Sequence, residues 1–189
     1  FISNIAANSG GGIVLKDDAD AVMNNVTMVN NIAEGLGGGL YINNADPSLD
    51  YTLVSGNISS AGGGVYIRND CTPTFNHTTV AYNTSGFEGG GVYLRDDSFL
   101  SVTNSVFWGN GGSQIYFRES GEEVSLNISY SLVEGGQNGI DDNNNGELNW
   151  NLGMLQDDPY FCNAESGNFS IRENSPCITA ADDGGFIGF

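Results

Sequence analysis

A glycine triplet that returns at nearly constant spacing constrains this chain more than any other feature. Triplets begin at Gly10, Gly37, Gly62 and Gly89, and each stands five or six residues after an asparagine. The asparagines, spaced 27, 26, 26 and 27 residues apart, are Asn4, Asn31, Asn57, Asn83 and Asn110. Self-similarity at such a period is typical of solenoids, in which each repeat is one supersecondary unit. The sequence therefore predicts a stack of coils, each about 26 residues long.

Apolar residues keep fixed places within each copy of the repeat. Four positions are apolar in all five copies, on short alternating segments separated by Gly, Asn, Asp and Pro. The four columns are Met23, Leu49, Phe75, Val102 and Ile128; Met28, Val54, Val80, Phe107 and Val133; Ile13, Leu40, Val65, Val92 and Ile115; and Leu15, Ile42, Ile67, Leu94 and Phe117. This alternation is typical of strands, and such a short coil buries its apolar face only against neighbouring coils. We therefore predict an all-β parallel β-helix of about six to seven coils, with three short strands per coil and neighbouring coils about 4.8 Å apart.

The asparagine and glycine columns have structural roles in such a stack. Asparagine side chains placed one above another hydrogen-bond along the ladder. Glycine permits positive φ and a close approach between backbones at the corner of each coil. A phosphate-binding loop is the functional interpretation of glycine-rich turns, but no helix follows these glycines. We expect the five asparagines to form one column.

The chain is strongly acidic. Five Lys and Arg residues stand against 23 Asp and Glu, which gives a formal net charge of -18. A surface of this charge repels phosphate backbones and anionic membranes, so nucleic acid is excluded as a partner. No apolar run is long enough to span a membrane. Because residues 1–4 lie inside a repeat, we expect this chain to be a piece of a longer protein.

Two stretches of the sequence resemble a known family. The repeat Asn-x-Ala/Ser followed by Gly-Gly-Gly-Leu/Val-Tyr-Ile, over residues 1–140, resembles the repeat of polymorphic outer-membrane proteins, which is found on right-handed β-helices. Residues 158–178, from Asp-Pro-Tyr-Phe to Asn-Ser-Pro-Cys-Ile, resemble the closing segment of secreted bacterial β-helix proteins that are similar in fold to pectate lyases. The resemblance implies a right-handed coil and a secreted or cell-surface location, but it implies no activity.

We divide the chain into the β-helix coils, residues 1–140, and a C-terminal coil with a capping segment of the same domain, residues 141–189. The last residues, 186–189, are apolar, and we expect them to lie over an open coil. At the other end, the first coil presents strand edges of the kind that recruit other strands unless they are covered. Either a second copy of the chain, placed end to end, or residues upstream of Phe1 are expected to cover it.

Tyrosines stand between the inward residues of the strands that follow the glycines. By strand alternation Tyr41, Tyr66, Tyr93 and Tyr116 point outward, about 4.8 Å apart. Such a face suits a sugar ring or a partner chain. A self-stacking ladder that stiffens the sheet explains the same residues. The four tyrosines are therefore a candidate ligand or partner face, with both interpretations open.

Residues 141–146 match the front half of a calcium loop. Asp141, Asn143 and Asn145 place oxygens at alternate positions, and Gly146 is the turn-forming glycine. The twelfth position is Leu152, so the usual bidentate glutamate is missing. Calcium is the candidate cofactor, and a plain polar turn between coils is the alternative.

The three cysteines indicate the redox environment. Cys162 and Cys177 lie close together near the C-terminus, and we predict a disulfide between them, as in proteins of oxidising compartments. Three reduced thiols are the alternative. Cys71 stands alone within a repeat.

Catalytic signatures are weak. Adjacent acidic pairs recur, but neighbouring residues of an extended chain point apart, and no Gly-His-Gly or Arg-x-Lys motif is present. The one histidine, His77, shares a column that we interpret as a surface position. Four cations followed by acids form a stripe of alternating charge; they are Lys16, Arg68, Arg95 and Arg118.

We therefore predict a non-enzymatic, extracellular or cell-surface structural or adhesion module that associates with itself. The alternative is a β-helix that binds or cleaves a neutral polysaccharide. The two differ in one structural feature, a groove that joins aromatic residues to acids from different coils.

Overall fold

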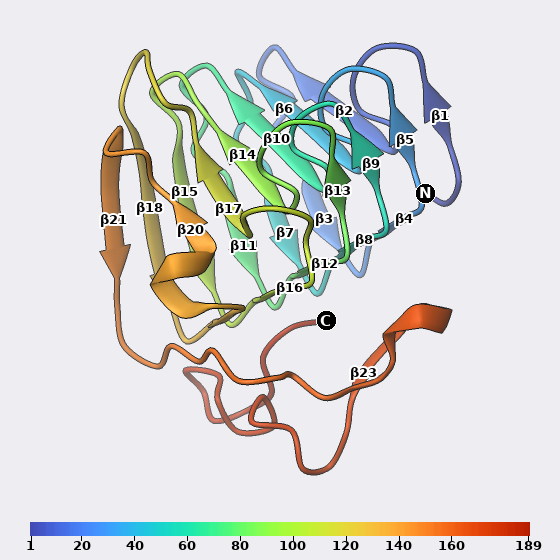
Figure 1. The fold of residues 1–189 in the computed structure, drawn as a ribbon, viewed down its shortest axis with the longest axis vertical. Coiled ribbons are helices and arrows are strands. Elements are labelled where there is room, and N and C mark those ends of the chain that lie inside the picture. Colours follow the sequence, from blue (N-terminus) through green and yellow to red (C-terminus); the bar gives the residue numbers. More distant parts are fainter.

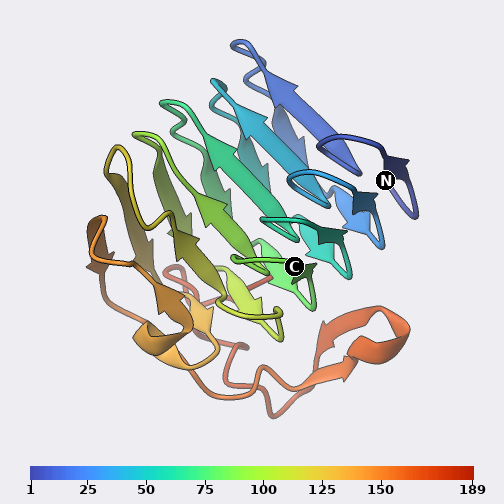
Figure 2. The ribbon, with the colours of Figure 1, turned by 45° about the horizontal axis from the view of Figure 1, so that its top comes forward.

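The computed structural model describes residues 1–189 and consists of about six stacked coils of β-strands with an irregular C-terminal segment along one side (Figure 1). All strands of the coils pair in parallel with the equivalent strands of the coils before and after. Figure 2 shows the strands as tilted parallel rows, with the N-terminal coil at one end of the stack. The predicted all-β parallel β-helix is confirmed.

Four sheets run along the stack. Sheet I consists of β2 (Ile13–Lys16), β6 (Leu40–Asn43), β10 (Val65–Arg68), β14 (Val92–Leu94), β17 (Ile115–Phe117) and β20 (Ile140–Asp141). Sheet II consists of β3 (Val22–Asn24), β7 (Ser48–Asp50), β11 (Thr74–Asn76), β15 (Phe99–Thr103), β18 (Val124–Ser129) and β21 (Gly146–Trp150). Sheet III consists of β4 (Thr27–Val29), β8 (Leu53–Ser55), β12 (Thr79–Ala81), β16 (Val106–Trp108) and β19 (Leu132–Val133). Sheet IV consists of the two-residue strands β1 (Ile5–Ala6), β5 (Ile32–Ala33), β9 (Ile58–Ser59) and β13 (Thr84–Ser85).

The repeat length predicts three strands per coil, whereas four of the coils contain a fourth, two-residue strand that belongs to sheet IV. Its strands follow directly after the asparagine column, as Ile32 follows Asn31. The bonds that the asparagines make between coils hold this corner in register, and the residues after it pair as short strands. A turn of 3₁₀ helix, η1 (Gly136–Gly139), replaces the corner in the last coil.

The four apolar columns form the core. A cluster of 24 buried residues fills the interior of the coils and contains most of the predicted inward positions. Val65, for example, pairs with Leu40 on one side and Val92 on the other, and all three are fully buried. Ile13 and Leu15 are only partly buried because they lie in the first coil. The expectation that another chain or upstream residues cover this coil stays a prediction.

The asparagines form the predicted column. The Oδ1 atom of Asn83 accepts hydrogen bonds from the backbone N–H and the Nδ2 of Asn57, both at 2.9 Å. The Nδ2 of Asn83 donates to the Val54 carbonyl at 2.9 Å and to Asn110 Oδ1 at 3.0 Å. A Cβ atom on Gly64 would lie 2.9 Å from Asn83 Nδ2, so this glycine gives the ladder room. The two columns thus act together: the asparagines form hydrogen bonds to buried polar groups between coils, and the glycines leave room for the asparagine side chains.

A second polar column lies between sheets II and III. The Oγ atom of Ser105 accepts the N–H of Thr78 at 3.0 Å, and the Oγ of Ser131 accepts the N–H of Ser105 at 3.0 Å. All three side chains are buried. This hydroxyl column satisfies the backbone at a second corner of the coil.

The C-terminal segment, residues 151–189, lies along the outer face of sheet III rather than over the end of a coil (Figure 1). It contains the antiparallel hairpin of β22 (Phe161–Asn163) and β23 (Asn168–Ile171), joined through the 3₁₀ turn η2 (Ala164–Ser166). Phe161, Phe169 and Ile187 pack in one cluster with outward residues of sheet III such as Val106 and Leu132. These outward residues are apolar, so burial against the C-terminal segment is favourable. The segment therefore packs on sheet III, and residues 186–189 do not lie over the end of a coil as we expected.

The last residues are also tied to the coils by hydrogen bonds. The Gly188 N–H donates to the Asn104 carbonyl at 2.7 Å, and the Phe189 N–H donates to Thr79 Oγ1 at 2.8 Å. Asn104 and Asp182 exchange two further bonds, of 2.9 and 3.0 Å.

The same packing overturns the surface position predicted for His77. Its ring stacks on Tyr51, with centroids 4.6 Å apart, and lies edge-on to Phe186 at 5.9 Å. His77 is only 6% exposed, because the C-terminal segment covers a column that would face water on the coils alone.

Candidate functional site

The four tyrosines of sheet I stack on one another. Ring centroids are 5.8 Å apart for Tyr41 and Tyr66, 4.9 Å for Tyr66 and Tyr93, and 5.1 Å for Tyr93 and Tyr116. Tyr66, Tyr93 and Tyr116 are 2, 9 and 3% exposed. The spacing between coils matches the stacking distance of aromatic rings, so each ring covers the next. The geometry supports the self-stacking ladder and leaves no open ring face on Tyr66 or Tyr93 for a ligand.

The predicted calcium loop is a turn between sheets I and II. The Nδ2 of Asn143 donates to the Phe117 carbonyl at 2.6 Å, and the Nδ2 of Asn145 donates to the Arg118 carbonyl at 2.8 Å. Asp141 is exposed at the end of β20. Both amides thus fasten this turn to the preceding coil, and no group of three or more His, Cys, Asp or Glu side chains is arranged around a metal position. Calcium at Asp141, Asn143 and Asn145 stays a prediction.

The predicted disulfide is not formed. Cys162 and Cys177 are both free thiols, the first exposed and the second buried. Along β22 the buried residue is Phe161, so strand alternation turns Cys162 to solvent, whereas Cys177 faces the apolar cluster under the C-terminal segment. Burial raises the pKa of the Cys177 thiol to about 11. Cys71 is a third free thiol, buried in the core of the coils.

The cationic stripe converges on one carboxylate. Arg95 Nε lies 2.5 Å, Arg118 Nη1 3.1 Å and Arg68 Nη2 3.8 Å from Asp96 oxygens. Three of the five cationic side chains are therefore paired on one edge of sheet I, as the alternating charges indicate.

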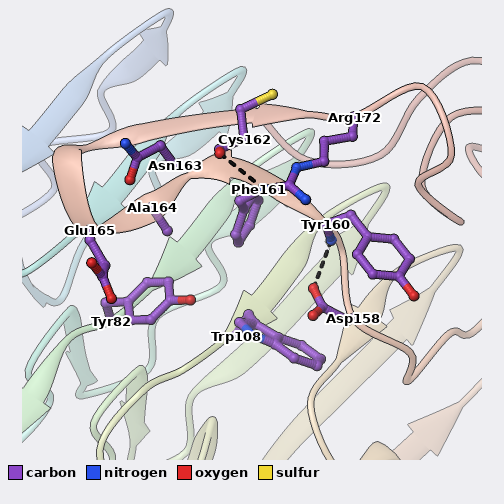
Figure 3. Close-up of a pocket in the computed structure, with 10 residues that line it drawn as sticks. All are labelled: Tyr82, Trp108, Asp158, Tyr160, Phe161, Cys162, Asn163, Ala164, Glu165 and Arg172. Carbon is purple, nitrogen blue, oxygen red and sulfur yellow. Dashed lines mark hydrogen bonds between the residues drawn. The ribbon is translucent and has the colours of Figure 1, made fainter.

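A groove lies between the β22–β23 hairpin and the turns that follow the strands of sheet III. Its first part has a volume of about 290 Å³. The coils contribute Tyr82 and Trp108, and the C-terminal segment contributes Asp158, Tyr160 and Glu165 (Figure 3). We call this the hairpin groove. Its volume is close to the lower limit of small-molecule sites, which is about 300 Å³.

A second hollow of about 400 Å³ continues the hairpin groove towards the first coil. It shares Tyr82, Ala164 and Glu165 with the first part and reaches Asn30 and Gly56. The coil residues that line the groove, from Asn30 to Trp108, come from four successive coils, which corresponds to about 15 Å along the stack. A short linear polymer would lie along it.

Tyr82 and Trp108 depart from the repeat at the positions where they line the groove. The equivalents of Tyr82 in neighbouring coils are Asn30, Gly56 and Gly109, all with φ between 56 and 66°. Tyr82 adopts the same left-handed conformation at φ 55°, where an aromatic side chain is unusual. The equivalents of Trp108 are smaller residues, Ser55 and Ala81. Large aromatics thus replace small residues in two adjacent columns, on one face.

The Tyr82 ring is held in place by its neighbours. A Cβ atom on Gly109 would lie 2.8 Å from Tyr82 Cε1, so the absence of a side chain at Gly109 makes room for the ring. On the hairpin side, the Phe169 ring lies with its centroid 6.0 Å from that of Tyr82. Tyr82 is still 43% exposed, and its free surface faces the hairpin groove.

Carboxylates give the groove its electrostatic character. Burial and the charges of Asp158, Glu134 and Glu165 raise the pKa of Tyr82. Asp158 Oδ1 accepts the backbone N–H of Tyr160 at 2.7 Å, which orients the carboxylate between Trp108 and Tyr160 (Figure 3). The cation of the groove is Arg172, whose Nη2 donates to the Cys162 carbonyl at 3.3 Å.

Sequence reasoning did not find this site, although one signal was present. Tyr82 interrupts a column of Asn and Gly, and Trp108 follows the smaller residues Val29, Ser55 and Ala81 in its column. Neither interruption identifies a groove by itself, because the opposite wall comes from residues 158–172, outside the repeat.

Comparison with known proteins identifies the coils and leaves the hairpin unmatched. A family model described as a right handed beta helix region matches residues 2–153. No curated protein and no solved structure matches the chain. No helix has both the length and the apolar character that a membrane span requires. The matched region includes Tyr82 and Trp108 and ends before Asp158 and the hairpin.

Proposed function

Because the chain belongs to the right-handed β-helix family, whose fold carries no activity by itself, we propose that its function resides in the hairpin groove. The protein is a secreted or cell-surface adhesion module that binds a carbohydrate chain there without cleaving it. The observation that carries this proposal is the groove itself, in which Tyr82 and Trp108, from successive coils, face Asp158 and Glu165.

The aromatic side chains support a saccharide as the ligand. Tyr82 and Tyr160 are 43 and 41% exposed, and Trp108 is partly exposed. An amphipathic ring suits the apolar face of a sugar, while nearby carboxylates accept hydrogen bonds from its hydroxyls. The continuous path of the groove across four coils supports a linear chain rather than a single small molecule.

The coils support a role as a rigid scaffold. The asparagine ladder, the hydroxyl column and the tyrosine ladder all link one coil to the next. Binding residues placed on such elements keep their geometry when the ligand is absent, which reduces the ordering cost of binding. The resemblance of the repeat to that of polymorphic outer-membrane proteins supports display at the cell surface.

The groups that could transfer protons bear on whether a bound saccharide is cleaved. The only histidine, His77, is buried between Tyr51 and Phe186, outside the groove. One oxygen of Asp158 is already bound by the Tyr160 N–H. Hydrolysis of a glycoside needs two carboxylates, and the bond from the Tyr160 N–H leaves Asp158 with one free oxygen. A bound hexasaccharide that releases no shorter sugars would agree with binding alone.

The tryptophan content makes the proposal directly testable. The chain has two tryptophans, Trp108 in the groove and Trp150 in β21. A Trp150→Phe variant keeps Trp108 as the single reporter. We expect its fluorescence to change on titration with a panel of neutral and charged hexasaccharides, with a saturable curve for at least one of them.

Matched variants locate the site. Tyr82→Ala should abolish the fluorescence response, whereas Phe87→Ala, which removes an aromatic residue that is 79% exposed outside the groove, should not. In a Trp108→Phe protein, Trp150 should not respond. No saturable response to any hexasaccharide, or equal loss in both alanine variants, would contradict carbohydrate binding in the groove.

A further inference from the structure

Acidic side chains outnumber basic ones in the hairpin groove. Asp158 and Glu165 line the groove, and Glu134 lies close enough to influence Tyr82. Arg172 is the opposing cation, and it is exposed at the rim, where its Nη2 donates to the hairpin backbone. The whole chain carries a formal net charge of -18. The groove therefore attracts cations and repels acidic sugars.

The carboxylates of the groove have unused acceptor capacity. Glu165 accepts no hydrogen bond and forms no ion pair, and Asp158 accepts one bond, through Oδ1. Aromatic side chains line the same groove: both carboxylates lie close enough to Tyr82 to raise its pKa, and Trp108 faces the groove with them (Figure 3). A carboxylate next to an aromatic face is suited to an ammonium group, which donates to the carboxylate and is attracted by the ring.

We propose that the saccharide bound in the hairpin groove carries free protonated amines, as an oligomer of an unacetylated amino sugar does. The inference rests on the proposed function, because it names the class of carbohydrate that the groove takes. The carboxylates of Asp158 and Glu165, in a groove also lined by Tyr82 and Trp108, supply two positions for amines on a chain that lies along it. A neutral sugar would leave both carboxylates without a charged partner, and a uronic acid would be repelled.

The experiment compares three hexasaccharides of equal length: glucosamine, N-acetylglucosamine and glucose oligomers, all β-1,4-linked. Isothermal titration calorimetry at about pH 5 keeps most of the amines protonated, because the neighbouring oxygens make a sugar amine a weaker base than lysine, and still leaves most carboxylates ionised. We expect the glucosamine hexamer to bind at least about tenfold more tightly than the other two. We also expect its affinity to fall as the salt concentration rises, because screening weakens the charge attraction.

Charge-neutral variants separate the groove from the general acidity of the protein. The double variant Asp158→Asn, Glu165→Gln keeps the size of both side chains, and the amide oxygen introduced at position 158 can still accept the Tyr160 N–H. It should lose the preference for the glucosamine hexamer. The control Asp17→Asn, Asp18→Asn removes the same two charges from the exposed turn after β2, and it should keep the preference.

Each outcome decides between the two proposals. Equal affinity for acetylated and unacetylated hexamers would overturn the amine inference and leave carbohydrate binding intact. A preference that both double variants weaken equally would also overturn it, because nonspecific attraction to an acidic protein would then explain the data. No binding of any hexamer would overturn both. Loss of the preference in the groove variant alone supports the inference.

Discussion

The coils and the C-terminal segment of this protein are held in place by different kinds of contact. In the coils, buried polar groups repeatedly bond to their own equivalents about 26 residues away, as Asn57 does with Asn83. In the C-terminal segment, each contact joins residues that have no equivalent elsewhere, as when Gly188 donates to the Asn104 carbonyl. The coils are therefore stabilised by repetition, and the segment by a few individual contacts.

This difference explains where the candidate site lies. A stack of equivalent coils has regular outer faces, and regular faces offer few hollows. The hairpin groove exists because an irregular segment lies against a regular sheet and leaves a gap beside it. The large aromatics Tyr82 and Trp108 face that gap from the regular side.

The largest effect should come from interrupting the asparagine ladder. In Asn83→Ala, three buried groups each lose a hydrogen bond: the backbone N–H of Asn57, the Val54 carbonyl, and the Nδ2 of Asn57, which keeps its bond to the Met28 carbonyl. Each costs about 1–3 kcal/mol, and we expect the free energy of unfolding to fall by about 3–6 kcal/mol in urea titrations. Asn4→Ala is the matched control, because Asn4 is exposed at the end of the ladder and should cost less. Equal losses at both positions would show that the ladder does not act as a buried network.

A smaller, local effect is expected from the C-terminal segment. Phe169 is 4% exposed and packs edge-on against Phe161 at 5.2 Å. Phe169→Ala removes about 3–5 kcal/mol of packing. We expect the N–H groups of Ile187 and Gly188, both hydrogen-bonded, to exchange with deuterium at least about a hundredfold faster, while the Asn57 N–H keeps its protection. Equal acceleration in the coils would show that coils and segment unfold as one unit, against the comparison.

The smallest expected effect is a pH dependence of stability that arises in the tyrosine ladder of the coils and not in the C-terminal segment. Burial, together with Tyr66 and Tyr116, raises the pKa of Tyr93 to about 12, above the usual value of about 10. The un-ionised phenol therefore contributes stability that is complete below about pH 10 and is lost as the pH rises through about 12. Melting temperatures measured from pH 9 to 12 should fall less steeply in Tyr93→Phe than in the unsubstituted protein. Parallel curves would show that ionisation of Tyr93 is not coupled to unfolding.

The parts of the fold that could be predicted are those in which equivalent residues of neighbouring coils contact one another. The four apolar columns, the asparagine ladder and the outward tyrosines follow from one alignment of five copies, since each residue in a column meets its own equivalent. Even there, the short sheet IV was missed, because two-residue strands leave no alternation to detect. The outward apolar residues of sheet III, such as Val106 and Leu132, were a signal that something covers this face.

The C-terminal predictions failed for a common reason. The burial of His77, the orientation of Cys162 away from Cys177 and the lateral path of residues 186–189 all depend on where the segment lies. That position results from apolar packing on sheet III and from single bonds such as Asp182 to Asn104. Spacing in the sequence carries no information on such contacts.

The sequence by itself determined the coil, its period, its register and its core, because in a solenoid each repeat packs on a copy of itself and a single period specifies every neighbour. Only the tertiary structure decided the groove. Tyr82 and Trp108 are exceptions within the repeat, and their surroundings depend on Asp158 and Glu165, which the chain brings back across several coils. A contact between a repeating and a non-repeating part follows from shape and burial, and both exist only once the chain has folded.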